Sequence, residues 1–336
     1  MFNASAMTRA FSAVAGLSMA AVLVSGAAWA QANPSNGKRV AYFQNSPNNP
    51  YTTRMKDAFI ERAKSYGMDV TVFATPFDPA LQAQQIDDAL AQRFDLLTVM
   101  PASESAIVPP LMRVRQAKLP VIIVNTEMKA GTESLYDAFV GERSADMGKL
   151  AGEAMAQVLE ASGRKDGKIA LLTGPLTEAV VGRRVDAIKQ ALAKYPGYKI
   201  VAVEDVKWDM ANAERVAGQL YARFAPQGGI DIIYGMADNV AIGAIRAAEA
   251  AGIPFGTKKG ELAVMGGACQ PPGIPMLRAG KIYATGVQVP QRTGRIAADL
   301  ANDYFNGKKL ERDHVQPVAT VTRANLAEWE ERCTWK

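Results

Sequence analysis

The chain has 336 residues, of which 49% are hydrophobic and 21% charged, and its formal net charge at pH 7 is +5. This is the composition of an ordinary globular protein, and the length is sufficient for two domains. The small positive excess is spread along the chain, so nucleic-acid binding is not expected.

The first thirty residues differ from the rest of the chain. Arg9 is their only charged residue, residues 10–28 are apolar or small, and Ala28-Trp29-Ala30 provides a small-x-small cleavage pattern. We therefore predict a cleavable signal peptide over residues 1–30 and export to the periplasm. A membrane anchor is the alternative, but serine and glycine residues interrupt the apolar run.

Two cysteines are present, Cys269 and Cys333. Both belong to the mature part of an exported chain, where disulfides persist, so we expect them to pair. Because neither lies near the cleavage point, a soluble periplasmic protein is favoured over a lipid-anchored one.

Residues 39–59 are predicted to form a strand, a short polar loop and a helix. The apolar run 40–43 is typical of a buried parallel strand, and open α/β sheets bind ligands at the carboxyl ends of such strands. The predicted ligand-binding residues of this loop are therefore Asn49, Tyr51 and Thr52. The alternative is that Asn-Asn-Pro only makes a turn and that Tyr51 packs at the helix start.

Strands and helices alternate through the rest of the chain. In the first half, strands are expected at 68–73, 96–100, 119–124 and 138–140, and helices at 80–92 and 105–117. A long helix over 142–162 opens a second series, with strands at 168–173, 198–206, 230–235, 262–266, 281–287 and near 317–322, helices at 179–194, 211–224, 239–251 and 291–306, and a closing helix. This order predicts two Rossmann-like α/β lobes with parallel sheets and a cleft that closes around a ligand.

The residue sets typical of enzymes are not found. His314 is the only histidine, which excludes a histidine-based triad and a multi-histidine metal site. No Walker loop or dinucleotide fingerprint follows a predicted strand. We therefore expect no catalytic residues, no metal and no cofactor. An exported hydrolase is the alternative, but no pair of a base and a nucleophile is visible in the sequence.

Polar and aromatic residues follow several predicted strands at their carboxyl ends, where ligands bind. Taken singly, an aromatic here could belong to the core and an arginine to a surface ion pair, but their shared position favours a binding site. Besides the opening loop, the candidates are Asn125, Arg184, Trp208, Asp238 and Gln288.

The order and motifs of residues 38–322 resemble the periplasmic sugar-binding proteins of ABC importers, the type I ribose-binding-like family. The strand, the Asn-Asn-Pro-aromatic loop and the Lys-Asp helix of residues 40–58 look like that family's opening unit, which implies ligand contacts for Asn49 and Tyr51. By the same resemblance, the family's binding arginine, wall aromatic and final binding glutamine correspond to Arg184, Trp208 and Gln288.

Several positions depart from the family pattern. Asn125-Thr126 replaces an Asp-Arg pair, Ala237 precedes Asp238 where an asparagine is usual, and Ala268 replaces an aspartate; Thr52 stands in place of a second aromatic. Two carboxylates that would accept bonds from sugar hydroxyls are therefore missing, while Arg184, a donor only, remains. The resemblance implies a ligand other than ribose: a deoxy or furanose sugar, a short polyol, or an acid bound through Arg184.

The resemblance also implies three chain crossings between the lobes, near Gly141, Gln288 and Val318. The N-terminal lobe would comprise residues 38–141 and 289–318, and the C-terminal lobe residues 142–288 and 319–336. Both cysteines then fall in the C-terminal lobe, where their bond would attach the tail to the loop after the strand at 262–266.

The predicted function is that of a non-catalytic receptor that delivers a small sugar or polyol to an ABC importer by docking, as a monomer, on the membrane subunits of the permease. A receptor for a sugar acid or another small anion bound through Arg184, and a chemotaxis-linked binding protein, are the alternatives left open. A LacI-like repressor shares the fold but needs a helix-turn-helix where this chain has its export signal.

Overall fold

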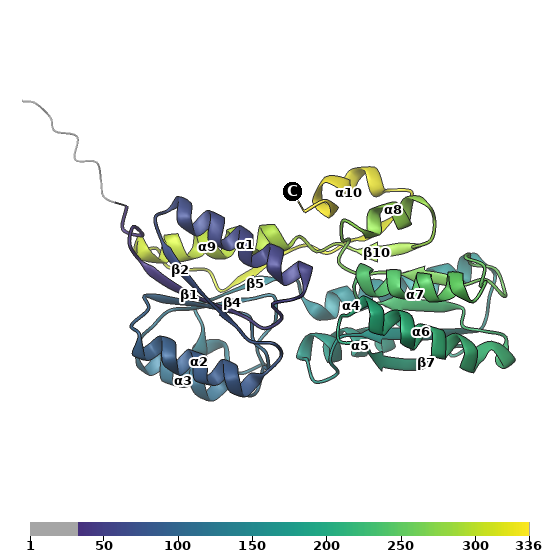
Figure 1. Cartoon of the computed structure of the whole chain (residues 1–336), viewed down its shortest axis with the longest axis horizontal. Helices are drawn as coiled ribbons and strands as arrows, with labels where there is room; N and C mark the ends of the chain where they lie inside the picture. Colours follow the sequence, from purple (N-terminus) through teal and green to yellow (C-terminus); the bar gives the residue numbers. More distant parts are fainter. Residues whose placement is uncertain (1–32, 336) are drawn as a thin grey trace, which may run out of the picture. The chain divides into compact units, whose positions relative to one another are not determined.

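The structure is a computed structural model that describes residues 33–335, so the predicted signal peptide lies outside the described residues. Within residues 33–335 the strands form two six-stranded sheets, and helices cover both faces of each sheet (Figure 1). This is the two-lobed α/β architecture that the alternation of strands and helices predicted.

The first sheet has the strand order β11-β5-β4-β3-β1-β2, and all its neighbouring strands are parallel. Residues 40–43 of β1, which lies between β3 and β2, are completely buried, as their apolar run predicted. The strands are β1 (Arg39–Gln44), β2 (Asp69–Ala74), β3 (Leu96–Val99), β4 (Val121–Val124), β5 (Ala138–Gly141) and β11 (Asp313–Val315). The helices around it are α1 (Pro50–Ser65), α2 (Pro79–Ala91), α3 (Val108–Gln116) and α9 (Pro290–Phe305), with the short 3-10 helix η1 (Glu133–Leu135).

The second sheet has the strand order β12-β10-β9-β8-β6-β7. Its strands are β6 (Gly167–Thr173), β7 (Tyr198–Asp205), β8 (Ile232–Gly235), β9 (Ala263–Met265), β10 (Ala284–Gly286) and β12 (Thr320–Thr322). Its helices are α4 (Ser144–Ala161), α5 (Ala179–Leu192), α6 (Met210–Phe224), α7 (Asp238–Ala250), α8 (Gly273–Arg278) and α10 (Leu326–Cys333), with the 3-10 helix η2 (Ala225–Gln227).

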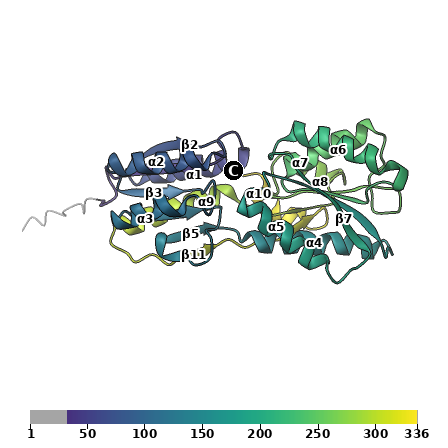
Figure 2. The ribbon, with the colours of Figure 1, turned by 90° about the horizontal axis from the view of Figure 1, so that it is seen from below.

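The structure corrects the expected elements at three places. The strand β12 pairs antiparallel with β10, so the second sheet is not wholly parallel. The strand β11, which lies beside β5 at the edge of the first sheet (Figure 2), was not predicted, and neither was α8. Both are short, and β11 lies in a polar stretch that has no apolar pattern and becomes a strand only through its backbone pairing with β5.

The chain passes between the two sheets three times. It leaves the first sheet after β5, returns between β10 and α9, and crosses again between β11 and β12. Helix α9 then packs beside α1, although the two are far apart in the sequence (Figure 1). The carboxyl ends of the strands of both sheets are thereby connected through short segments, the arrangement expected of a hinged pair of lobes.

The two cysteines are joined in the structure, with their Cα atoms 5.1 Å apart. This bond connects the end of α10 to the loop that follows β9. Across residues 33–335, no helix combines the length and the apolar character needed to cross a bilayer.

Candidate functional site

A cavity with an empty volume of about 500 Å³ is lined by residues that follow strands of both sheets. This position agrees with the general location of ligand sites in open α/β sheets. Its lining consists of Asn45, Ser46, Asn49, Tyr51, Thr52, Asn125, Glu178, Val180, Arg184, Trp208, Met236, Ala237, Ala268, Gln270 and Gln288.

The structure brings together all but one of the residues predicted to bind ligand. The exception is Asp238, which does not line the cavity. The residues that do are Asn49, Tyr51, Thr52, Asn125, Arg184, Trp208 and Gln288.

The first helical turn of α1 supplies one wall of the cavity. Asn49 is the N-cap of this helix, and its side-chain oxygen accepts a hydrogen bond from the backbone N–H of Tyr51 at 2.9 Å. The hydroxyl of Thr52 accepts a bond from Gln44 Nε2 at 3.1 Å and donates to the carbonyl of Ser46. The Asn-Asn-Pro sequence therefore does form a turn and a helix start, and the same geometry turns these residues toward the cavity.

Tyr51 connects this wall to two of the chain crossings. Its side chain is 7% exposed, and its hydroxyl donates to Glu142 Oε2 at 3.3 Å and accepts from Gln288 Nε2 at 3.4 Å. Burial, followed by the charge of Glu142, raises the pKa of Tyr51 well above its usual value, so the hydroxyl stays protonated. Because Glu142 follows β5 and Gln288 follows β10, Tyr51 lies where the two lobes meet.

Arg184 of α5 places a buried guanidinium in the cavity wall. Its side chain is 6% exposed; Nη2 donates to Gln288 Oε1 at 3.3 Å and Nη1 to the carbonyl of Met236 at 3.4 Å. Among residues 33–335, its Nε has no hydrogen-bond partner. Gln288 also donates to Glu142 at 3.1 Å, so a neutral amide links the guanidinium to a carboxylate.

Trp208 forms another part of the wall, in the turn between β7 and α6. Lys207 and Trp208 both have left-handed backbone angles, with φ values of 56° and 57°. The ring lies directly over Gly174, where a Cβ atom would come within 1.9 Å of the indole, so only glycine fits there. The indole N–H donates to the carboxylate of Glu178, at 3.3 and 3.4 Å from its two oxygens.

Glu178 is a carboxyl group of the site that the sequence did not suggest. Burial raises its pKa to about 7, and the bond from Trp208 and the positive charge of Arg184 only partly oppose this rise. It lies in the loop after β6, six residues before Arg184. A search of this loop for hydrogen-bond acceptors as well as donors would have identified Glu178.

Asp238 lies outside the cavity lining and fixes a loop that lines the cavity. This first residue of α7 is 1% exposed, and its carboxylate accepts bonds from the Thr285 hydroxyl and from the backbone N–H of Gln270, both at 2.6 Å. Burial raises the pKa of Asp238 to about 7, against the effect of these donors. Its oxygens hold the loop after β9, and Gln270 of that loop reaches the cavity in its place.

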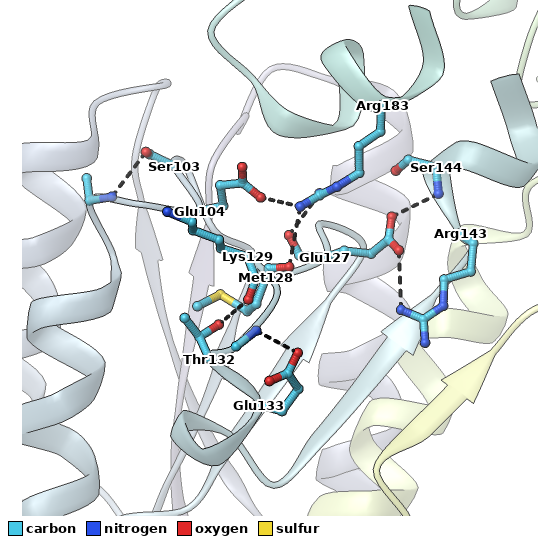
Figure 3. A network of polar contacts seen from close by, with 12 residues as sticks. Ser103, Glu104, Glu127, Met128, Lys129, Thr132, Glu133, Arg143, Ser144 and Arg183 are labelled. Carbon is cyan, nitrogen blue, oxygen red and sulfur yellow. Dashed lines mark hydrogen bonds and ion pairs between the residues drawn. The ribbon is translucent and has the colours of Figure 1, made fainter. Parts of the chain in front are cut away.

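Charged side chains also join the two lobes outside the cavity (Figure 3). Arg183 of α5 donates to Glu104 and to the carbonyls of Glu127, at 3.2 Å, and Met128, at 3.3 Å. The carboxylate of Glu127 in turn accepts from the backbone N–H of Ser144 at 2.9 Å. These contacts connect loops of the first sheet to α4 and α5 of the second.

Comparison with known proteins gives a consistent result. The relatives include the ribose import binding protein of Salmonella typhimurium, which is 23% identical and aligns over 83% of this chain and 89% of its own length. They also include a putative rhizopine-binding protein of Rhizobium meliloti, which is 27% identical and aligns over 93% of this chain and 96% of its own.

A solved structure shows the same fold. The ABC transporter solute-binding protein of Bacillus halodurans C-125, which contains bound myo-inositol, superimposes with a TM-score of 0.79 at 25% identity, and the match covers 89% of this chain and 99% of that one. These relatives are binding proteins, as expected for a receptor rather than an enzyme. Because residues 40–309 match the model of the periplasmic binding protein domain, this chain belongs to the periplasmic binding protein family.

Proposed function

We propose that this protein is a periplasmic receptor that binds a neutral sugar or polyol between its lobes and delivers it to an ABC importer. We choose a neutral ligand because of the charged groups that surround Arg184. Its charge lies close to two carboxyl groups: Glu142, which is linked to it through Gln288, and Glu178 in the cavity wall, which is ionised above its pKa of about 7. A buried cation with such neighbours needs no negative charge from the ligand.

The polar groups of the cavity suit hydroxyl groups. The free Nε–H of Arg184 requires an acceptor and the Glu178 carboxylate accepts donors, and a hydroxyl can serve as either. Tyr51 and Trp208 come from different lobes, and we infer that their rings contact the C–H faces of the ligand. Asn49, Asn125 and Gln288 would add amide groups, whereas Thr52 and Asp238 would act by holding their loops.

A sugar acid fits this cavity less well. Its carboxylate could pair with the Arg184 guanidinium, but it would also lie close to Glu142 and, above the Glu178 pKa of about 7, to an ionised Glu178. Repulsion between like charges in a partly buried site opposes binding of an anion. The ribose and myo-inositol named for two of the relatives support the neutral class for this chain as well.

The remaining parts of the proposal concern the place and partners of the protein. We infer that the signal peptide over residues 1–30 directs it to the periplasm, and that the monomer, with its two lobes closed, docks on the membrane subunits of a permease. The two lobes, 38–141 with 289–318 and 142–288 with 319–336, would each present one side of that docking surface.

A thermal-shift screen of the mature protein tests this proposal. The panel contains pentoses, hexoses, pentitols, inositols and sugar acids. A ligand at 100 times its Kd stabilises the folded protein by about 2.7 kcal/mol, which gives a clear shift. We expect a neutral compound to give the largest shift. Shifts from sugar acids alone, or from no compound in the panel, would contradict the proposal.

A further inference from the structure

The segment that follows α10 runs from one lobe to the other. Cys333 is bonded to Cys269 in the loop after β9, the loop that also contributes Ala268 and Gln270 to the cavity lining. Helix α10 lies near α8 and β10 of the second lobe (Figure 1). Two residues after Cys333, Trp335 has reached the first lobe.

Trp335 packs directly against the cavity residue Tyr51. The two ring centroids are 5.8 Å apart, and the rings meet edge to face at 72°. The Trp335 side chain is 7% exposed, and its carbonyl accepts a hydrogen bond from Arg54 Nε at 2.8 Å. Tyr51 and Arg54 both belong to the first turns of α1, so the segment is attached to the start of that helix.

Trp335 occupies this position despite two unfavourable features. Its φ angle of 56° lies in the left-handed region, which bulky residues seldom adopt. Its indole N–H is buried and, within the described part of the chain, has no hydrogen-bond partner. Such a conformation persists only where the surroundings hold it, here by the disulfide on one side and α1 on the other.

We propose that Trp335 is a positioning residue for ligand binding, which the Cys269–Cys333 bond tethers to the second lobe and which holds the Tyr51 ring in its binding orientation. The hydroxyl of Tyr51 is fixed by Glu142 and Gln288, and the contact with Trp335 fixes the ring as well. A ring that is ordered before the ligand arrives loses less rotational freedom on binding. The effect on affinity rests on the proposed function, whereas the attachment of the segment to α1 does not.

The first test needs no ligand. Hydrogen exchange is measured by mass spectrometry in the wild type, in Trp335→Ala and in the control Trp329→Ala. Trp329 is an indole on α10, the helix that precedes the segment of Trp335, and it packs against the core of the second lobe. We expect the amides of residues 51–54 to exchange faster in Trp335→Ala only. Unchanged exchange there, or the same increase in both variants, would overturn the proposal.

The second test measures Kd by calorimetry with whichever of D-ribose, D-allose, xylitol and myo-inositol shifts the wild type most. Loss of an aromatic pair predicts a rise in Kd of about three- to tenfold for Trp335→Ala. Trp335→Phe keeps a ring, and it should stay within about twofold of the wild type by the same reasoning, as should Trp329→Ala. An unchanged Kd in Trp335→Ala, or an equal rise in Trp329→Ala, would refute a positioning role.

Two further controls separate the possible failures. If Trp335→Ala does not fold, Arg54→Ala removes the other contact of the segment and is expected to speed exchange at residues 51–54 in the same way. If none of the four probes binds the wild type, the proposed ligand class fails, and the exchange experiment still decides whether the segment holds α1.

Discussion

Two neighbouring arginines of α5 have different roles because a helix turns by about 100° per residue. Arg184 points into the cavity, where Gln288 and the carbonyl of Met236 accept its hydrogen bonds. Arg183 points to the contacts between the lobes and pairs with Glu104 (Figure 3). Under the proposed function the buried residue would decide which ligand charge is tolerated, whereas the more exposed one makes contacts between the lobes.

Trp208 is the residue whose removal should weaken binding most. We expect Trp208→Ala to raise Kd by at least about thirtyfold, the size typical of an aromatic hot spot. The ring is half-buried, so the melting temperature of the ligand-free protein should change little. Calorimetry and thermal unfolding measure the two effects. A large loss of stability without ligand would show that Trp208 serves the core instead.

Glu178 should make stability depend on pH. Its pKa is about 7 in the folded protein and about 4.5 in a free chain, so between these values the folded state keeps a proton that the unfolded state has lost. The free energy of unfolding therefore falls as pH rises through this window and levels off above pH 7. Glu178→Gln cannot ionise and lacks this fall.

The melting temperatures of ligand-free wild type and Glu178→Gln, measured at pH 5 and pH 8, check this expectation. Asp238, which shifts in the same direction, is present in both proteins and cancels in the comparison. The variant should gain stability relative to the wild type as the pH is raised. A difference in melting temperature that is the same at both pH values would contradict the raised pKa.

At the scale of residues, position could be read from the sequence but orientation could not. Asn49, Tyr51 and Trp208 follow apolar strands, and the rule that ligands bind at strand ends places them at the cavity. Asp238 also follows a strand, yet its carboxylate turns toward Thr285 and Gln270, which lie far along the chain. Tertiary packing determines such hydrogen-bond partners, so no local pattern in the sequence indicates them.

At the scale of elements, the long helices and strands could be predicted from the sequence, whereas the short strand β11 and the direction of β12, which depend on tertiary pairing, could not. The helix α9 and the strand β6 bury apolar faces, so their periodicity predicts them to within about one residue, whereas α1 continues to Ser65, beyond the predicted unit 39–59. The strands β11 and β12 are three residues long and form by pairing with β5 and β10. The antiparallel direction of β12 follows from the last crossing of the chain rather than from its own sequence.

The Cys269–Cys333 bond should stabilise the second lobe and its tail. It closes a loop with a sequence separation of 64 residues, for which the chain-entropy model gives about 4 kcal/mol. We expect unfolded, unreduced protein to show no free thiol, and reduction to lower the melting temperature. Two titratable thiols in the protein purified from the periplasm would show that the bond does not form.

At the scale of the whole molecule, the three crossings and the cavity belong to one arrangement. Tyr51, Glu142 and Gln288 meet where two crossings leave their sheets, so under the proposed function a ligand held between Tyr51 and Arg184 would also touch the segments about which the lobes would turn. Binding and closure would then be coupled, since the ligand would complete contacts that both lobes share.

A matched pair of ligands tests the central claim most directly. The neutral sugar that stabilises the wild type most in the screen is compared by calorimetry with the sugar acid that carries a carboxylate in place of its terminal CH₂OH group. At pH 8, where Glu178 is ionised, Arg184 already has the charges of Glu142 and Glu178 nearby, so the neutral sugar should bind at least about tenfold more tightly, the effect of about 1.4 kcal/mol of charge repulsion. Equal or tighter binding of the acid would contradict a receptor for neutral sugars.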